Sequence, residues 1–260
     1  MFRSLYTAAS GMYAQQMNMD EITENLANAN TTGYKRGRVD FEDLVYSAMA
    51  EPGALGSYGP EVPVASQVGA GVRAAGVEKV FSPGELLHTG NPLDLAIHGN
   101  GFFQVKLEDG TTGYTRDGVV HINKEGELTI SGHSIAGIKI PEKATGLEVQ
   151  EDGTIKAFVK DPKEKETLGQ IKLVRFLNPA GLRLQGSVFL ETPISGKVLE
   201  GKAGEPGFGL VKSGYLEKAN VNLVEEMMNI VMAQRAYEFN AKAVTASDEM
   251  MRLTTQLQPK

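Results

Sequence analysis

The chain has 260 residues, of which 41% are hydrophobic and 22% charged, and its formal net charge is −6 at pH 7. This composition is typical of a folded chain with one large or two modest domains, and the negative charge argues against nonspecific binding to nucleic acid or anionic lipid. The chain has no cysteine, which excludes disulfides, thiolate metal sites and cysteine nucleophiles.

The first residues do not have the pattern of a secretory signal peptide. After Met1-Phe2-Arg3, polar residues such as Ser10 and Gln15 interrupt the apolar run that a signal peptide needs. No later segment is long and apolar enough to span a membrane. We therefore expect neither a cleaved signal peptide nor membrane insertion.

The opening segment has helical periodicity. Ser4 is a plausible cap for a helix that runs to about Asn28, and the chain then passes through asparagines and Gly33, which favour the end of a helix. One stripe repeats every seven residues, and a second follows it by three: Leu5, Met12, Met19 and Leu26, then Ala8, Gln15, Ile22 and Ala29. This spacing predicts an amphipathic helix with a seam for another helix.

A region rich in proline and glycine comes next. Phe41–Tyr46 is a short apolar run, whereas Glu51–Gly76 contains prolines 52, 60 and 63 and many glycines, so no regular element can persist through it. Composition leaves two interpretations open. The segment is either a flexible linker or an extended hairpin arm that lies on a neighbouring molecule.

From Val77 to about Val211 the pattern changes to short alternating runs between glycine turns. Phe102–Leu107 precedes Glu108-Asp109-Gly110, and Leu147–Val149 precedes Glu151-Asp152-Gly153. Such runs predict an antiparallel β domain, either a sandwich or a partly closed barrel.

The last segment predicts a second and longer helix. Leu223–Leu257 contains neither glycine nor proline, and Asn222 with Glu225 can cap its start. Its apolar stripe is Leu223, Ile230, Tyr237, Val244 and Met251, and the expected second stripe, four residues on, is Met227, Gln234, Ala241, Asp248 and Thr255. We expect the two terminal helices to pair as a coiled coil, in which Gln15 and Gln234 fix the register.

The predicted fold class is therefore α+β, with a discontinuous coiled-coil domain from the two termini and an inserted antiparallel β domain. The expected divisions are a helical polymerisation domain at 1–34 and 220–260, a connecting region with the arm at 35–76 and 212–219, and a β-rich outer domain at 77–211.

Residues with catalytic chemistry form no convincing site in the sequence. The four histidines show no metal-ligand spacing, and Gly99-Asn100-Gly101 lacks the lysine and the helix of a phosphate loop. Ser131, His133 and Ser134 are close in sequence, but they are typical of a polar hairpin tip rather than a catalytic triad. We predict no catalytic, cofactor-binding or metal site.

Several motifs resemble those of the bacterial flagellar rod and hook proteins, in the family's order. They are Asn28 through Lys35, Phe81–Leu86, Thr89–Phe103, Tyr114–Gly118, Asn220–Glu226 and Ala233–Lys242. The motif residues that we single out are Asn28, Asn30, Gly33, Tyr34, Lys35, Asn91, Asp94, Gly99, Gly101, Phe102, Phe103, Gln234, Arg235 and Tyr237. Within the family, the chain length, Phe41–Tyr46 followed by Pro52-Gly53-Ala54, and Gly69–Arg73 resemble the distal rod component.

The resemblance implies a structural subunit that self-assembles into a rigid hollow helical tube, transmits torque from the motor to the hook, and is not an enzyme. It further implies type III export without a cleaved signal, a place in the flagellar basal body across the periplasm, and contacts with proximal rod subunits, hook subunits, outer ring bushings and the export apparatus. The expected subunit contacts are Leu5, Met12, Met19, Ile22, Leu26, Leu223, Met227, Ile230, Tyr237, Val244 and Met251.

Two alternatives stay open. One is another axial rod or hook-type subunit of the same family. The other, from a different class, is a secreted β-domain glycan binder or hydrolase with a helical oligomerisation stalk. The specific motifs lie at helix ends and turns rather than in a convergent polar cluster, which favours the structural subunit.

Overall fold

The computed structural model describes residues 2–50, 66–141, 144–159 and 165–256, and these form two compact units. Unit 1 contains the described parts of Met1–Leu26, Gly37–Glu78 and Leu223–Lys260, and unit 2 contains Ala27–Arg36 and the described parts of Lys79–Asn222. The helices at the two ends and the antiparallel β region between them confirm the α+β class. No helix in the described ranges is long and apolar enough to cross a membrane.

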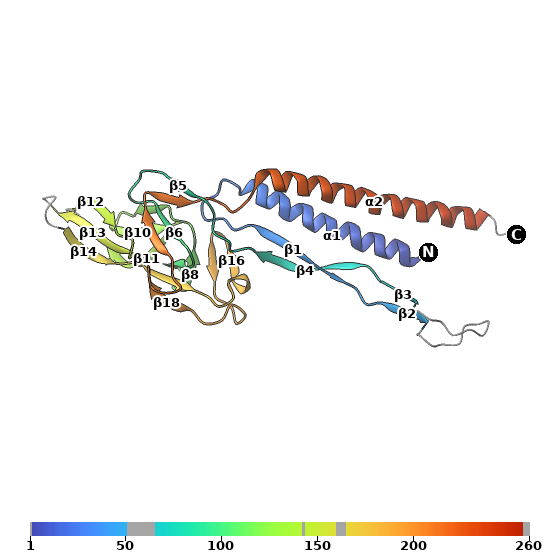
Figure 1. Ribbon diagram of the computed structural model, residues 1–260, viewed down its shortest axis with the longest axis horizontal. Coiled ribbons are helices and arrows are strands. Elements are labelled where there is room, and N and C mark those ends of the chain that lie inside the picture. Colours follow the sequence, from blue (N-terminus) through green and yellow to red (C-terminus); the bar gives the residue numbers. More distant parts are fainter. Residues whose placement is uncertain (1, 51–65, 142–143, 160–164, 257–260) are drawn as a thin grey trace. The chain divides into compact units, whose positions relative to one another are not determined.

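Unit 1 consists of two long helices and a β-ribbon (Figure 1). Helix α1 spans Phe2–Ala27 and helix α2 spans Leu223–Gln256. The ribbon pairs β1 (Gly37–Asp43) with β4 (Val72–Lys79), and further along it pairs β2 (Ser47–Ala50) with β3 (Ser66–Val68). The middle of the expected arm, residues 51–65, lies outside the described residues.

Helices α1 and α2 lie side by side and antiparallel within unit 1 (Figure 1). The Ser4 Oγ lies 3.4 Å from the Ser247 Oγ, and a Cβ added at Gly11 would lie 2.9 Å from the Asn240 Nδ2. A step of seven residues toward the C-terminus of α1 thus corresponds to a step of seven residues toward the N-terminus of α2, as expected for an antiparallel pair. A glycine inside a helix costs roughly 1 kcal/mol relative to alanine, so close contact with Asn240 is the local reason for Gly11.

The seam of α2 differs in part from the expected one. Its buried residues are Glu226, Ala233 and Ser247. Ile230 and Val244, from the expected first stripe, are partly buried. The second stripe therefore follows the first by three residues and not by four. The expected positions Met227, Gln234, Asp248 and Thr255 are exposed. Near Gly11 the two helices approach closely, and the buried positions of α2 on either side of Asn240, Ala233 and Ser247, carry small side chains. Gln234 is exposed, so the prediction that it is a core-side register residue was wrong for this pair.

Helix α1 is covered on a second side by the ribbon (Figure 1). The Val72 N–H donates to the Ser10 Oγ at 3.3 Å, and the Arg3 guanidinium donates to the Val68 carbonyl at 3.0 Å. Ala14 and Ile22 are buried. Helix α1 therefore has two covered sides, whereas α2 has one narrow buried seam in unit 1.

Unit 2 is built on antiparallel sheets. The largest sheet has the strand order β16-β17-β8-β7-β11-β10-β9, with β15 pairing to both β7 and β18. The other sheets are β12-β13-β14, β19-β6 and β20-β5. The strands are β5 (Leu86–His88), β6 (Leu95–His98), β7 (Phe102–Lys106), β8 (Thr112–Thr115), β9 (Val120–Ile122), β10 (Glu127–Ile130), β11 (His133–Lys139), β12 (Ala144–Val149), β13 (Thr154–Val159), β14 (Lys165–Gln170), β15 (Lys172–Arg175), β16 (Arg183–Gln185), β17 (Val188–Leu190), β18 (Leu199–Lys202), β19 (Leu210–Ser213) and β20 (Tyr215–Glu217), with a short 3-10 helix at Pro179–Gly181.

Alternation along these strands produces the core of unit 2. Phe103, Val105 and Leu173 point into the main hydrophobic cluster, whereas Phe102 and Val174, their neighbours in sequence, belong to a second and smaller cluster. Adjacent residues of a strand face opposite sides of a sheet, so strands β7 and β15 separate two cores.

Candidate functional site

The segment that follows α1 folds into unit 2 and makes a tight turn there. Gly33 has φ +68°, and its N–H donates to the Glu217 carbonyl at 2.8 Å. A Cβ at Gly33 would lie 2.5 Å from the Arg116 carbonyl carbon and the Asp117 nitrogen. Both the left-handed backbone and the lack of space therefore require glycine.

Lys35, two residues later, belongs to a buried ion cluster with Glu217 and Arg116. The Lys35 Nζ lies 2.6 Å from Glu217 Oε1, and an Arg116 terminal guanidinium nitrogen (NH1) lies 3.2 Å from Glu217 Oε2. The side chains of Lys35, Glu217 and Arg116 are 0%, 1% and 3% exposed. The Gly84 N–H also donates to Glu217 Oε1, at 2.9 Å.

The cluster holds two cations and one carboxylate. Burial lowers the pKa of the Lys35 ammonium; Glu217 opposes this effect and the Arg116 charge adds to it. Burial also lowers the pKa of Arg116, again opposed by Glu217. Each cation also donates to a backbone carbonyl, Lys35 to Ser82 at 2.8 Å and Arg116 to Gly99 at 2.8 Å. Removing the one carboxylate would leave two buried charges without a counter-ion, which is strongly destabilising.

Further hydrogen bonds hold the same segment in unit 2. The Arg36 N–H donates to the Asn220 Oδ1 at 2.7 Å, and the Asn220 Nδ2 donates to the Val80 carbonyl at 2.8 Å. The Thr32 hydroxyl donates to Asp117 at 2.7 Å. Four distant parts of the chain thus meet here, so the segment that follows α1 and the segment that precedes α2 are both held within unit 2.

The second motif, between Thr89 and Phe103, also has a structural role. Asp94 is buried and accepts hydrogen bonds from the Thr89 hydroxyl at 2.6 Å and from the Asn91 Nδ2 at 2.9 Å, which closes the turn before β6. Gly99 and Gly101 both have positive φ, and Phe102 and Phe103 enter the two cores. The motif residues of this stretch therefore set backbone geometry and packing.

The expected subunit-contact residues fall into two groups in unit 1. Ile22 is buried, and Leu5, Met12, Met19, Leu26, Ile230, Val244 and Met251 are partly buried. Leu223, Met227 and Tyr237 are exposed, as are the motif residues Gln234 and Arg235.

A larger exposed apolar surface on α2 was missed in the sequence. We call it the outer face of α2, and it consists of Val224, Met228, Val231, Met232, Phe239, Met250 and Leu253. Helical spacing alone could have identified this surface. The heptad interpretation considered only the apolar stripe expected to face the other helix, so it overlooked the apolar residues on the opposite side. Large apolar side chains gathered on one exposed surface usually mark an interaction site.

The three charged residues of the ion cluster differ in how easily the sequence reveals them. Lys35 and Gly33 were identified as motif residues, and Arg116 was part of the motif Tyr114–Gly118. Glu217 was missed. Its only local signal is a carboxylate at the end of the short apolar strand Tyr215–Glu217, where a buried acid needs a partner.

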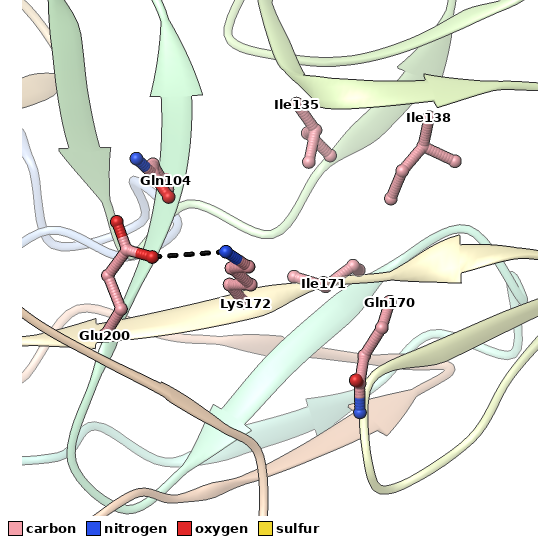
Figure 2. A pocket seen from close by; sticks show the side chains of 7 residues that line it. All are labelled: Gln104, Ile135, Ile138, Gln170, Ile171, Lys172 and Glu200. Carbon is pink, nitrogen blue, oxygen red and sulfur yellow. Dashed lines mark hydrogen bonds and ion pairs between the residues drawn. The ribbon is translucent and has the colours of Figure 1, made fainter.

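A cavity of about 280 Å³ in unit 2 shows no arrangement for catalysis (Figure 2). Its wall is formed by the isoleucines at 135, 138 and 171, and its polar side by Gln104, Gln170 and the ion pair of Lys172 with Glu200 at 3.2 Å. Both members of this pair are largely exposed. In the described ranges, no group of three or more His, Cys, Asp or Glu residues could hold a metal ion.

Comparison with known proteins gives matches along the whole chain. Three family models match: "Flagella basal body rod protein" at residues 5–35, "Flagellar hook protein FlgE/F/G D1 domain" at 96–157, and "Flagellar basal body rod FlgEFG protein C-terminal" at 212–257. The chain is 41% identical to the flagellar basal-body rod protein FlgG of Caulobacter vibrioides, over 98% of this chain and 99% of that protein.

Two further relatives carry the names FlgG and FlgF. The chain is 41% identical to the FlgG of Borreliella burgdorferi, over 99% of each chain. It is 31% identical to the flagellar basal-body rod protein FlgF of Escherichia coli, over 99% of this chain and 98% of that protein. The higher identity to proteins named FlgG agrees with the distal rod features of the sequence.

Proposed function

Since the chain belongs to the family of flagellar basal-body rod proteins, it is a structural subunit of the flagellar distal rod and not an enzyme, and we propose that it assembles through its terminal helices. The distal rod is the rigid hollow shaft that transmits torque from the motor to the hook. Neither the exposed ion pair of Figure 2 nor the histidines favour a glycan binder or hydrolase.

The outer face of α2 is the single observation that carries this mechanism. Val231, Met232 and Phe239 are more than half exposed in unit 1. Complete burial of a Val, Met or Phe side chain is worth about 1.5–3 kcal/mol. Burying several of them against a second copy would therefore offset much of the entropy that a subunit loses on assembly.

Within a subunit, the proposed pairing is an antiparallel coiled coil of α1 and α2. Its seam contains the contact at Ser4 and Ser247 and the close approach of Gly11 to Asn240. In this proposal the expected contact residues have two roles. Ile22, Ile230 and Val244 support the pair, and Leu223 and Met227 join the outer face in contacts between subunits.

The remaining partners follow from the family. We propose that the subunit meets proximal rod and hook subunits at the two ends of the distal rod, turns within the outer ring bushings, and reaches the periplasm through the flagellar export apparatus. We further propose that the proline- and glycine-rich segment Glu51–Gly76 extends onto a neighbouring subunit and stiffens the tube. This proposal rests on proline content, since three prolines reduce the entropy lost when the arm becomes ordered.

The test is assembly of purified full-length protein on concentration, measured by sedimentation and negative-stain microscopy. Val231→Lys should abolish tube formation while helix content by circular dichroism stays unchanged. Thr254→Lys adds the same charge at an exposed polar position of α2 and should assemble normally. Tubes of Val231→Lys that equal those of the parent would show that the outer face is not an assembly surface.

A further inference from the structure

A second cavity of unit 2, about 300 Å³ in volume, differs in chemistry from the one in Figure 2. We call it the arginine recess. Its lining contains two arginines and no carboxylate, and is formed by Phe81, Asn100, Gly101, Phe102, Arg116, Arg175, Phe176, Leu177 and Pro179. The aromatic wall is fixed by edge-to-face contacts of Phe102 with Phe81 at 5.4 Å and with Phe176 at 5.9 Å between ring centroids.

Positive charge in the recess is not balanced locally. Arg116 is shared with the buried ion cluster, where Glu217 already serves two cations, and its Nε has no hydrogen-bond partner in the described part of the chain. Arg175 contacts the Phe208 ring at 5.9 Å from its centroid and makes no ion pair with any described residue. Arg175 is only partly buried and lines the recess.

These features select a carboxylate as the ligand. A guanidinium presents paired N–H donors that match the two oxygens of a carboxylate. The cavity is at the small end of the range for ligand sites, which suits one acidic side chain better than a large cofactor.

The rim of the recess adds an apolar requirement. Leu177 is 87% exposed and Ile194 is 74% exposed. Two hydrogen bonds hold Leu177 and Ile194 near each other. The Asn178 side-chain amide donates to the Ile194 carbonyl, and the Asn178 backbone N–H donates to the Ser195 carbonyl. A free small acid would leave these side chains in water, whereas a polypeptide with an apolar residue beside the acid would cover them.

The chain itself contains such a segment. Asp43 is exposed and makes no ion pair with a described residue, and Val45 and Tyr46 nearby in the sequence are 85% and 54% exposed. The segment leaves strand β1 without regular structure at Leu44–Tyr46, so it can present adjacent side chains to a recess.

We propose that the arginine recess receives the Asp43 carboxylate of a second copy, with Val45 and Tyr46 of that copy against Leu177 and Ile194. The inference rests on the proposed self-assembly, because a second copy is then the neighbour present at the highest local concentration. It adds a contact that involves unit 2, separate from the outer face of α2.

The experiment uses dilute, isotopically labelled full-length protein, verified as a monomer by ultracentrifugation, so its result does not depend on tube formation. A synthetic peptide of residues 40–47 is titrated to millimolar concentration, and amide shifts are followed by NMR. We expect saturable shifts confined to the recess. Replacing Asp43 by Asn in the peptide, or Arg175→Gln in the protein, should weaken binding at least tenfold.

Matched controls decide the outcome. The peptide with Glu42→Gln and the protein with Lys172→Gln carry the same charge changes elsewhere and should bind as the parents do. Absence of shifts in the recess would overturn the proposal, as would equal binding of the Asp43→Asn peptide.

If phenylacetate binds as tightly as the peptide and displaces it, the recess is a site for free carboxylates, and the second copy is not its occupant. Failure of wild-type protein to form tubes would instead count against the proposed function.

Discussion

Replacing Glu217 by Gln should destabilise unit 2 far more than replacing Lys35 by Met. Glu217→Gln keeps the shape of the side chain but leaves Lys35 and Arg116, 0% and 3% exposed, without a counter-ion. Breaking a buried pair by removing one partner costs about 3–5 kcal/mol, and here one carboxylate serves two cations, so we expect the upper end.

Lys35→Met has a smaller expected cost because it removes the excess charge. Glu217 keeps its ion pair with Arg116 and its hydrogen bond from Gly84, and the Ser82 carbonyl keeps the hydrogen bond that the Asn220 Nδ2 donates at 3.2 Å. The hydrogen bonds of a charged group, which are lost with the ammonium, are worth about 1.5–3 kcal/mol. The two substitutions should therefore differ by about 2 kcal/mol or more, a large fraction of a typical domain stability of about 5–15 kcal/mol.

The assay is denaturant unfolding of monomeric protein, followed by circular dichroism in the β region and by tyrosine fluorescence, because the chain has no tryptophan. An equal loss of stability in the two variants would refute the reasoning, since it would mean that Glu217 does not carry the charge balance of the cluster.

The pH dependence gives the same variants a second readout. Folding lowers the Lys35 pKa below its ordinary 10.5, so between the folded pKa and 10.5 the unfolded chain binds more protons than the folded one. Stability should therefore rise with pH across that window, by at most about 1.4 kcal/mol per pH unit for one group. Subtracting the Lys35→Met curve from the parent curve should isolate this rise, and a flat difference would contradict it.

Three further predictions concern single contacts. Ser4→Cys with Ser247→Cys should form an intramolecular disulfide in dilute protein, detected by a mobility shift under non-reducing electrophoresis, because the hydroxyls lie 3.4 Å apart and the chain has no other cysteine. Gly11→Ala should lower the thermal midpoint, and Asn240→Ala in the same chain should reverse that loss, because the new methyl group needs the space of the amide. Burial raises the pKa of Tyr114 to about 12, so the folded state holds this proton longer and stability should fall as pH rises from 10 to 12; Tyr114→Phe should remove that fall in alkaline unfolding curves.

Periodicity was a good guide to the long elements and a poor guide to which side chains meet. The repeat through Ile230 and Val244 predicted the helix, but within its stripe Ile230, Val244 and Met251 are only partly buried and Leu223 and Tyr237 are exposed. It could not predict that Ala233 and Ser247 lie inward, because small and polar residues acquire that place only when Gly11 allows the other helix to approach.

The ion cluster was less predictable for a different reason. Lys35, Arg116 and Glu217 are far apart in the sequence, and none has a local pattern that names the others. The motif resemblance identified Lys35 as a motif residue but did not indicate that it forms a buried ion pair. Only the meeting of β20 with the turn after α1 shows why a lysine stands there, since Glu217 ends that strand.

The separation of Lys35 and Glu217 also sets an order of events in folding. The two residues are 182 positions apart, so a growing or emerging chain contains the lysine long before its counter-ion. Contacts this distant form late, because the entropy of closing the loop is lost before the contact stabilises anything. Until Glu217 arrives, an ammonium group at the centre of the turn favours water, and the turn stays open. We therefore expect the turn after α1 to close only when almost all of the polypeptide is present.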